Sequence, residues 1–175
     1  ASMGIYIFTW EKLKKYLVSD EEDKNSENDF GKNIIPNMLN AGEKLFAYDF
    51  KGYWKDVGTI SSLWEANMDL LDTKSDLVLN DDKWKIYARS TAEPPHFTGD
   101  KAVIKNSLIT EGCSILGSVT NSIISPSVVV GENAVVEDCT IMPGVIIQDG
   151  AVVKHSIIGA GAVIGSGAVV GGTQK

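Results

Sequence analysis

Aliphatic residues recur at a fixed spacing through the C-terminal part of the chain. Three related segments start at residues 121, 138 and 155, that is, every 17 residues: Asn121-Ser122-Ile123-Ile124, Asp138-Cys139-Thr140-Ile141 and His155-Ser156-Ile157-Ile158. The same step separates Val130 from Ile147 and Ile164, and Val136 from Val153 and Val170. Each unit therefore has three large aliphatic positions, six, six and five residues apart. This pattern predicts a three-sided coil whose inward residues stack on their equivalents one coil away.

We therefore expect residues 101–175 to form a left-handed parallel β-helix of hexapeptide repeats. A β-sandwich is the alternative, but its alternating strands would not keep one period through so many aligned positions. The coil that begins at Asn106 is less regular, because it precedes the next unit by only 15 residues. The last coil ends in Val169-Val170-Gly171-Gly172 without a capping helix, which favours an oligomer or a packed neighbouring domain.

The first 85 residues show a mixed pattern. Strands are predicted at Ser2–Phe8 and at Lys44–Phe50, where Phe46, Tyr48 and Phe50 alternate with smaller or polar residues. Helices are predicted after Thr9, over Gly31–Asn40 with Ile34, Ile35, Met38 and Leu39 on one face, and after Thr59. The acidic segment Asp20–Asn28 is interpreted as a solvated loop, and 86–100 as an extended connector.

This order predicts an α/β fragment over residues 1–85, the end of a Rossmann-like nucleotidyltransferase domain. So few strands would leave a sheet edge unpaired, and we infer that a partner segment is missing. There is no glycine-rich phosphate-binding motif before Lys101.

Composition narrows the possible functions. The formal net charge is −7 and Arg89 is the only arginine, so no basic face for a nucleic-acid backbone is expected. No apolar run approaches the roughly 20 residues that span a bilayer, and no membrane association is expected. Cys113 and Cys139 have no metal-ligand spacing and are predicted to be buried core residues. Nothing requires an oxidising compartment, so a cytoplasmic location is the default expectation.

Three short motifs occur in the first 70 residues. They are Ala1-Ser2-Met3-Gly4-Ile5-Tyr6, then Asn28-Asp29-Phe30-Gly31, and then Tyr53-Trp54-Lys55-Asp56-Val57-Gly58-Thr59 followed by Trp64-Glu65-Ala66-Asn67. In this order, and followed by a β-helix, they resemble the C-terminal portion of the subunit of bacterial ADP-glucose pyrophosphorylase (glucose-1-phosphate adenylyltransferase). That family makes ADP-glucose and pyrophosphate from ATP and glucose 1-phosphate for glycogen synthesis, using Mg²⁺.

The resemblance implies roles for particular residues. Ser2 and Asp56 would contact glucose 1-phosphate, and Asp56 would also hold a metal ion. A carboxylate suits that role, because Mg²⁺ is typically bound by one or two carboxylates together with substrate phosphates. Tyr6, Asp29 and Trp54 would line the sugar site, although the residues themselves favour packing for Tyr6 and Trp54 and helix capping for Asp29.

The resemblance has limits. The family's glycine-rich nucleotide loop, its first metal aspartate and its Glu-Lys pair have no counterpart here, so we expect the 175-residue chain alone not to turn over. Lys55 is expected on the surface. In the family, subunits form homo- or hetero-tetramers.

Two other classes of function remain open. One is a hexapeptide-repeat acyltransferase, in which a coil histidine such as His155 acts as general base. The other is a non-catalytic regulatory or assembly subunit, in which the β-helix serves oligomerisation. The motif around Asp56 favours a catalytic lineage and has no place in a simple acyltransferase.

Overall fold

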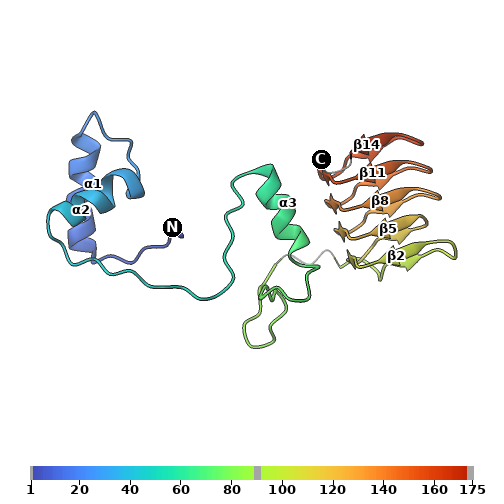
Figure 1. Ribbon diagram of the computed structural model, residues 1–175, viewed down its shortest axis with the longest axis horizontal. Coiled ribbons are helices and arrows are strands. Elements are labelled where there is room, and N and C mark those ends of the chain that lie inside the picture. Colours follow the sequence, from blue (N-terminus) through green and yellow to red (C-terminus); the bar gives the residue numbers. More distant parts are fainter. Residues whose placement is uncertain (1, 89–91, 173–175) are drawn as a thin grey trace. The chain divides into compact units, whose positions relative to one another are not determined.

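A computed structural model describes residues 2–88 and 92–172. The chain divides into two compact units, 1–54 and 55–175, and each is described by itself. Figure 1 shows the order of their elements along the chain.

The second unit contains a β-helix of short parallel strands arranged in three sheets. Sheet A consists of β1 (Phe97–Thr98), β4 (Ser114–Ile115), β7 (Val129–Val130), β10 (Ile146–Ile147) and β13 (Val163–Ile164). Sheet B consists of β2 (Val103–Lys105), β5 (Ser118–Thr120), β8 (Val135–Glu137), β11 (Val152–Lys154) and β14 (Val169–Gly171). Sheet C consists of β3 (Leu108–Ile109), β6 (Ile123–Ile124), β9 (Thr140–Ile141) and β12 (Ile157–Ile158). Every neighbouring pair in these sheets is parallel and joins one coil to the next.

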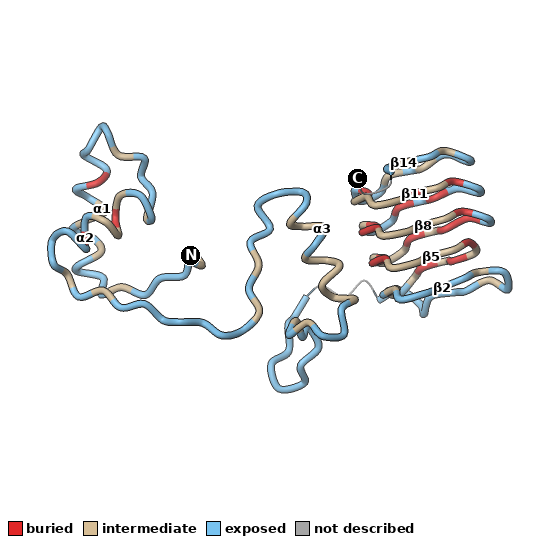
Figure 2. Tube along the Cα trace, viewed as in Figure 1, coloured by how far each residue is buried: buried red, intermediate tan, exposed pale blue. Residues whose placement is uncertain are grey.

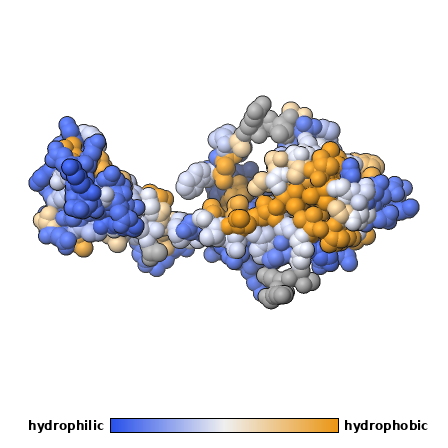
Figure 3. Space-filling view, turned by 90° about the horizontal axis from the view of Figure 1, so that it is seen from above, coloured by the Kyte–Doolittle hydropathy of each residue, from blue (hydrophilic) through white to orange (hydrophobic). Residues whose placement is uncertain are grey.

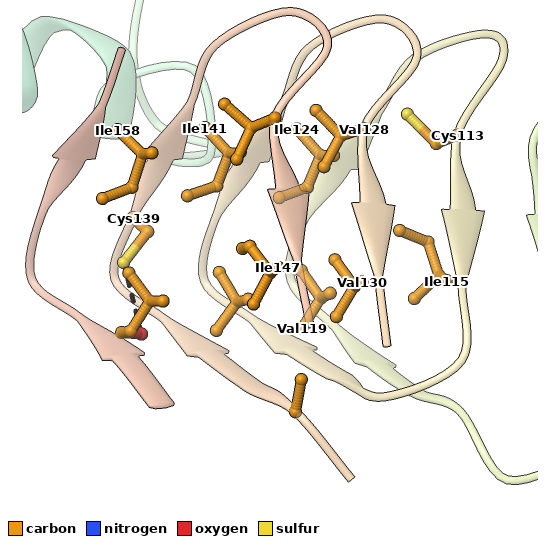
Figure 4. Packing of buried hydrophobic residues seen from close by; sticks show 14 of the residues in the cluster. Cys113, Ile115, Val119, Ile124, Val128, Val130, Cys139, Ile141, Ile147 and Ile158 are labelled. Atoms are coloured by element: carbon orange, nitrogen blue, oxygen red, sulfur yellow. Dashed lines mark hydrogen bonds between the residues drawn. The ribbon is translucent and has the colours of Figure 1, made fainter. Parts of the chain in front are cut away.

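The observed register confirms the predicted period. Ile124 pairs with Ile141 and Ile158 follows Ile141 in the same column, so the three lie one above another along the stack (Figure 4). Val130 and Ile147 form an equivalent column in sheet A. The central inward residues are completely buried, and they form one continuous aliphatic core. The first strand pairs with β4 and begins at Phe97, within the segment that the sequence predicts as a connector.

The irregular coil has a physical cause at one corner. Between sheets A and B, Val130 and Val136 are six residues apart, whereas Ile115 and Val119 are only four apart. The chain is therefore two residues shorter at Leu116–Gly117, and every column that crosses this corner shows the 15-residue step. A Cβ on Gly117 would come within 2.4 Å of the Ala134 carbonyl oxygen, so only glycine fits the shortened turn. A hollow of about 260 Å³ remains there, lined in part by Asp100, Leu116 and Glu132.

The other corners use left-handed backbone. Between sheets B and C, the residues at equivalent positions of successive coils all have positive φ: Asn106, Asn121, Asp138 and His155. Asparagine and aspartate tolerate this conformation better than most residues. The Asn106 amide donates to Asn121 Oδ1 at 2.8 Å, and the Asn121 amide donates to Asp138 Oδ1 at 2.7 Å. We call these four residues the corner column. Its side-chain ladder joins consecutive coils.

Helix α3 (Ile60–Met68) belongs to the same unit and lies beside the corner column. Thr59 caps it as predicted. The Ser62 N–H donates to Thr59 Oγ1 and the Thr59 N–H donates to Ser62 Oγ, both at 3.1 Å, which is a reciprocal capping box.

The first unit is helical and has a small core. Helix α1 spans Trp10–Glu22, a π-turn η1 spans Phe30–Ile34, and α2 spans Ile35–Asn40. Ile34 and Met38 are buried, but Leu39, which was predicted on the same face, is 63% exposed. Figure 2 shows that buried residues are sparse here and concentrated in the β-helix.

Two predictions for this unit are wrong. The segments 2–8 and 44–50 contain no strand, and their hydrophobic residues point into solvent: Ile7 is 97% exposed and Phe46 is 92% exposed. An alternating pattern fits a sheet, but a strand also needs a neighbour for its backbone hydrogen bonds, and none is present within the described residues of this unit.

The predicted acidic loop is also partly wrong. Helix α1 continues to Glu22, because no glycine or proline stops it earlier, and Asp20 is buried. The Ser26 hydroxyl donates to Asp20 Oδ1 at 2.7 Å, which compensates the carboxylate for its loss of water.

Candidate functional site

The structure brings Ser2, Tyr6 and the segment that follows Asp29 together within the first unit. Ser2 Oγ and Tyr6 Oη lie 2.7 Å apart, and the Gly4 N–H donates to Ser2 Oγ at 3.2 Å. The Tyr6 ring stacks on the Phe30 ring with centroids 5.6 Å apart. Ser2 and Tyr6 are both exposed, so a hydroxyl pair on an aromatic platform faces solvent, a combination suited to a sugar.

Asp29 has a structural task in the same place. Its Oδ1 accepts the Lys32 N–H at 2.8 Å and so caps η1, as the residues alone predict. Lys32 in turn pairs with Glu27. Trp54 is the last residue of this unit and is 44% exposed. Any contact of Asp29 or Trp54 with a sugar therefore stays a prediction.

Asp56 lies in a tight turn immediately before α3. Its Oδ1 accepts the Gly58 N–H at 3.1 Å, which is an Asx-turn, and its side chain is exposed. A Cβ on Gly58 would lie 3.3 Å from that same oxygen, so a small residue suits the turn. The carboxylate is consequently held at a fixed point of the backbone while remaining open to solvent. Asp56 can supply one oxygen ligand to a cation.

Lys55 is not a simple surface lysine, contrary to the sequence expectation. Its Nζ lies 2.9 Å from Asp69 Oδ2 and 3.3 Å from Glu65 Oε2, and the side chain is only 25% exposed. The hydrogen bond with Asp69, supported by the one with Glu65, raises the pKa of Lys55 above its ordinary value. The spacing of Glu65 and Asp69, one helical turn apart, is the signal that could have revealed this contact.

Trp64 is a second residue that sequence reasoning missed. Its Nε1–H donates to the Asp138 carbonyl oxygen at 2.8 Å, and its ring lies 4.3 Å from the His155 ring, centroid to centroid. A groove of about 290 Å³ opens beside this contact and is lined in part by Ser61, Trp64 and His155. A tryptophan that is half-buried beside a helix cap carries no sequence signal for which carbonyl it will reach.

His155 is therefore occupied as a packing partner of α3. Its ring contacts Trp64 and its backbone has φ of +45° in the corner column. This arrangement gives His155 a structural explanation that the acyltransferase interpretation does not need.

The remaining chemistry is limited. Among residues 2–88 and 92–172, no group of three or more His, Cys, Asp or Glu side chains could hold a metal ion. Cys113 and Cys139 are buried free thiols, as predicted, and burial raises the pKa of Cys139 to about 11. No helix in the described part of the chain is long and apolar enough to cross a membrane.

Comparison with known proteins agrees with this division of the chain. The nucleotidyl transferase family model matches residues 1–73, and the GlmU-like C-terminal hexapeptide model matches residues 94–175. The chain thus joins a segment of an α/β nucleotidyl transferase to a hexapeptide β-helix, which confirms the predicted fold class.

More specific relatives are glucose-1-phosphate adenylyltransferases. The chain is 56% identical over 136 residues to the one from Clostridium novyi (strain NT), which is 78% of this chain and 36% of that protein. It is 59% identical over 138 residues to the one from Clostridium perfringens (strain 13 / Type A), which is 79% of this chain and 35% of that protein. The predicted resemblance to this family is therefore confirmed, and the chain spans about a third of the length of the curated relatives it matches.

Proposed function

We propose that this chain is the C-terminal part of a glucose-1-phosphate adenylyltransferase, which makes ADP-glucose and pyrophosphate from ATP and glucose 1-phosphate. The identity of 56–59% to curated enzymes of that name carries the proposal. Because the chain spans about a third of those enzymes, we also propose that it does not turn over alone. Tetrameric assembly and a cytoplasmic location stay predictions.

The proposed sugar-phosphate residues are Ser2 and Asp56, with Tyr6, Asp29 and Trp54 as further candidates for the sugar site. The hydroxyl pair of Ser2 and Tyr6 supports the first assignment, since hydroxyls and an aromatic face are common ligands of sugars. The exposed carboxylate of Asp56 supports the second.

Nucleotidyltransferases of this family generally use a divalent metal, and we propose Mg²⁺ with Asp56 as one of its ligands. A single carboxylate fits, because Mg²⁺ is usually bound by one or two carboxylates, waters and substrate phosphates. When bound, the ion would neutralise phosphate charge that develops during nucleotidyl transfer. The chain's own contribution is to hold the Asp56 carboxylate in place through the Gly58 N–H.

A chimera tests the proposal. Residues 1–175 replace the matching segment of the Clostridium perfringens relative, and pyrophosphate release from ATP and glucose 1-phosphate is measured with Mg²⁺. We expect activity in the chimera, a loss of about 100-fold or more with Asp56→Asn, and little change with Asp49→Asn, an exposed carboxylate outside the motif. An active Asp56→Asn chimera would remove Asp56 from the site. ADP-glucose pyrophosphorolysis by the isolated chain would overturn the prediction that it is inactive.

A further inference from the structure

The Asp56 turn is fixed to α3 on both of its sides. On the N-terminal side, Lys55 reaches across to Glu65 and Asp69 in and just after the helix. On the C-terminal side, Thr59 forms the capping box with Ser62. Between these two points the chain contains only Asp56, Val57 and Gly58. Because both ends of this short segment are bonded to the same helix, the turn must move with α3.

Helix α3 is in turn fixed to the β-helix through Trp64. The indole N–H donates to the carbonyl of Asp138, and the ring packs on His155 in the next coil. Both partners belong to the corner column, whose side-chain ladder runs from Asn106 through Asn121 to Asp138. The acceptor carbonyl therefore belongs to a corner that its neighbouring coils hold in place.

We propose that the corner column of the β-helix positions the Asp56 carboxylate, with Trp64 and Lys55 as the positioning residues that transmit the constraint. This inference rests on the proposed function for the role of Asp56, but the mechanical link itself does not. The β-helix then has a task in the reaction beside any task in assembly. Neither positioning residue contacts substrate in this account, and each acts through the placement of Asp56.

Amide hydrogen exchange on the 175-residue chain tests the link without any activity. Trp64→Phe keeps a ring against His155 but removes the indole donor. We expect the amides of Gly58 and Ser62 to exchange about fivefold faster or more, while those of β8 in the β-helix core are unchanged. Trp84→Phe, at a tryptophan that is 83% exposed, is the matched control and should change neither. Unchanged exchange at Gly58 and Ser62 in the Trp64 variant would overturn the proposal.

Lys55 provides a second, independent pair of variants. Lys55→Gln removes the charge that both carboxylates share, and we expect the same acceleration at Gly58. Lys55→Arg restores the charge and should return exchange to the wild-type rate. Lys51→Gln, which affects an exposed lysine paired with Asp49, is the control. A Lys55→Gln protein that exchanges like wild type would show that the lysine does not hold the turn.

Activity in the chimera separates this inference from the proposed function. We expect Trp64→Phe and Lys55→Gln to lower kcat about tenfold or more and to raise the Mg²⁺ concentration needed for half-maximal rate, with the KM for ATP unchanged and Lys55→Arg restoring kcat. If the unsubstituted chimera is inactive, the proposed function fails and the exchange data alone decide the link. If it is active and these variants retain normal kcat, the positioning role fails while the proposed function stands.

Discussion

The β-helix and the N-terminal unit contain similar hydrophobic patterns, but they bury them to very different extents. In the β-helix, Ile124, Ile141 and Ile147 are completely excluded from solvent. In the N-terminal unit, Ile7 and Phe46 are almost fully exposed, in segments that alternate as a strand would. The difference lies in the neighbours that each strand-like segment finds within its own unit.

A repeat provides its own neighbours. Each coil pairs its backbone with the coil before and after it, and each inward side chain packs on its equivalent, so one short sequence unit is enough to specify the fold. The segments 2–8 and 44–50 have no such internal partner. The comparison shows that a local hydrophobic pattern predicts a strand only where the chain also contains the strand's neighbour.

The most disruptive test introduces a charge at one inward position of a coil. Ile147→Asp places a carboxylate in the aliphatic core without a partner, and we expect the β-helix to lose more than about 4 kcal/mol of unfolding free energy. Ile146→Asp, at the adjacent outward position of the same strand, should cost less than about 1 kcal/mol. Denaturant unfolding followed by circular dichroism measures both. Equal losses would mean that inward and outward positions are not distinct.

A smaller effect is expected at the shortened corner. Gly117→Ala directs a methyl group at the carbonyl oxygens of Ala134 and Gly131, and we expect a loss of about 1–3 kcal/mol. Gly159→Ala is the control, because nothing lies within 4 Å of its Cβ, and it should change stability by no more than about 0.5 kcal/mol. Thermal unfolding of the two variants distinguishes them. A stable Gly117→Ala protein would show that the corner has room.

The smallest effect concerns the N-terminal unit alone. Lys12 Nζ lies 2.7 Å from Glu43 Oε2, and this hydrogen-bonded ion pair lowers the pKa of Glu43 below its ordinary value of 4.5. Its contribution is therefore present above about pH 4.5 and is lost as the pH falls through the lower, folded-state pKa. We expect helical circular dichroism at 222 nm to weaken in that acidic range before the β-helix signal changes. Glu43→Gln should remove this pH dependence, whereas Glu11→Gln, on an exposed face of α1, should retain it.

The sequence predicts the β-helix well because its evidence is repeated. The columns through Ile141 and Val153, the cap at Thr59 and the burial of Cys139 all follow from residue spacing or type, and the structure confirms them. The strands at 2–8 and 44–50 could not be excluded in this way, because their alternation is genuine and only the absence of a paired neighbour prevents them from forming.

The candidate site is less predictable for a related reason. The turn at Asp56 and the cap at Asp29 follow from local residue preferences. The contact from Trp64 to the Asp138 carbonyl joins residues 74 positions apart, and no periodicity encodes it. The partners of Lys55 lie between these cases, since Glu65 and Asp69 share a helix face but nothing in the sequence aims them at Lys55.

The shortened turn at Leu116–Gly117 has a consequence for how such a stack tolerates change. Two residues are absent there, yet Val119 still pairs with Val136 in register, and the lost volume survives only as a surface hollow. Coil length can thus vary at one vertex without shifting the layers above or below. Vertices, and not the flat sides, are where foreign peptides could be grafted into this scaffold with the remaining rungs undisturbed.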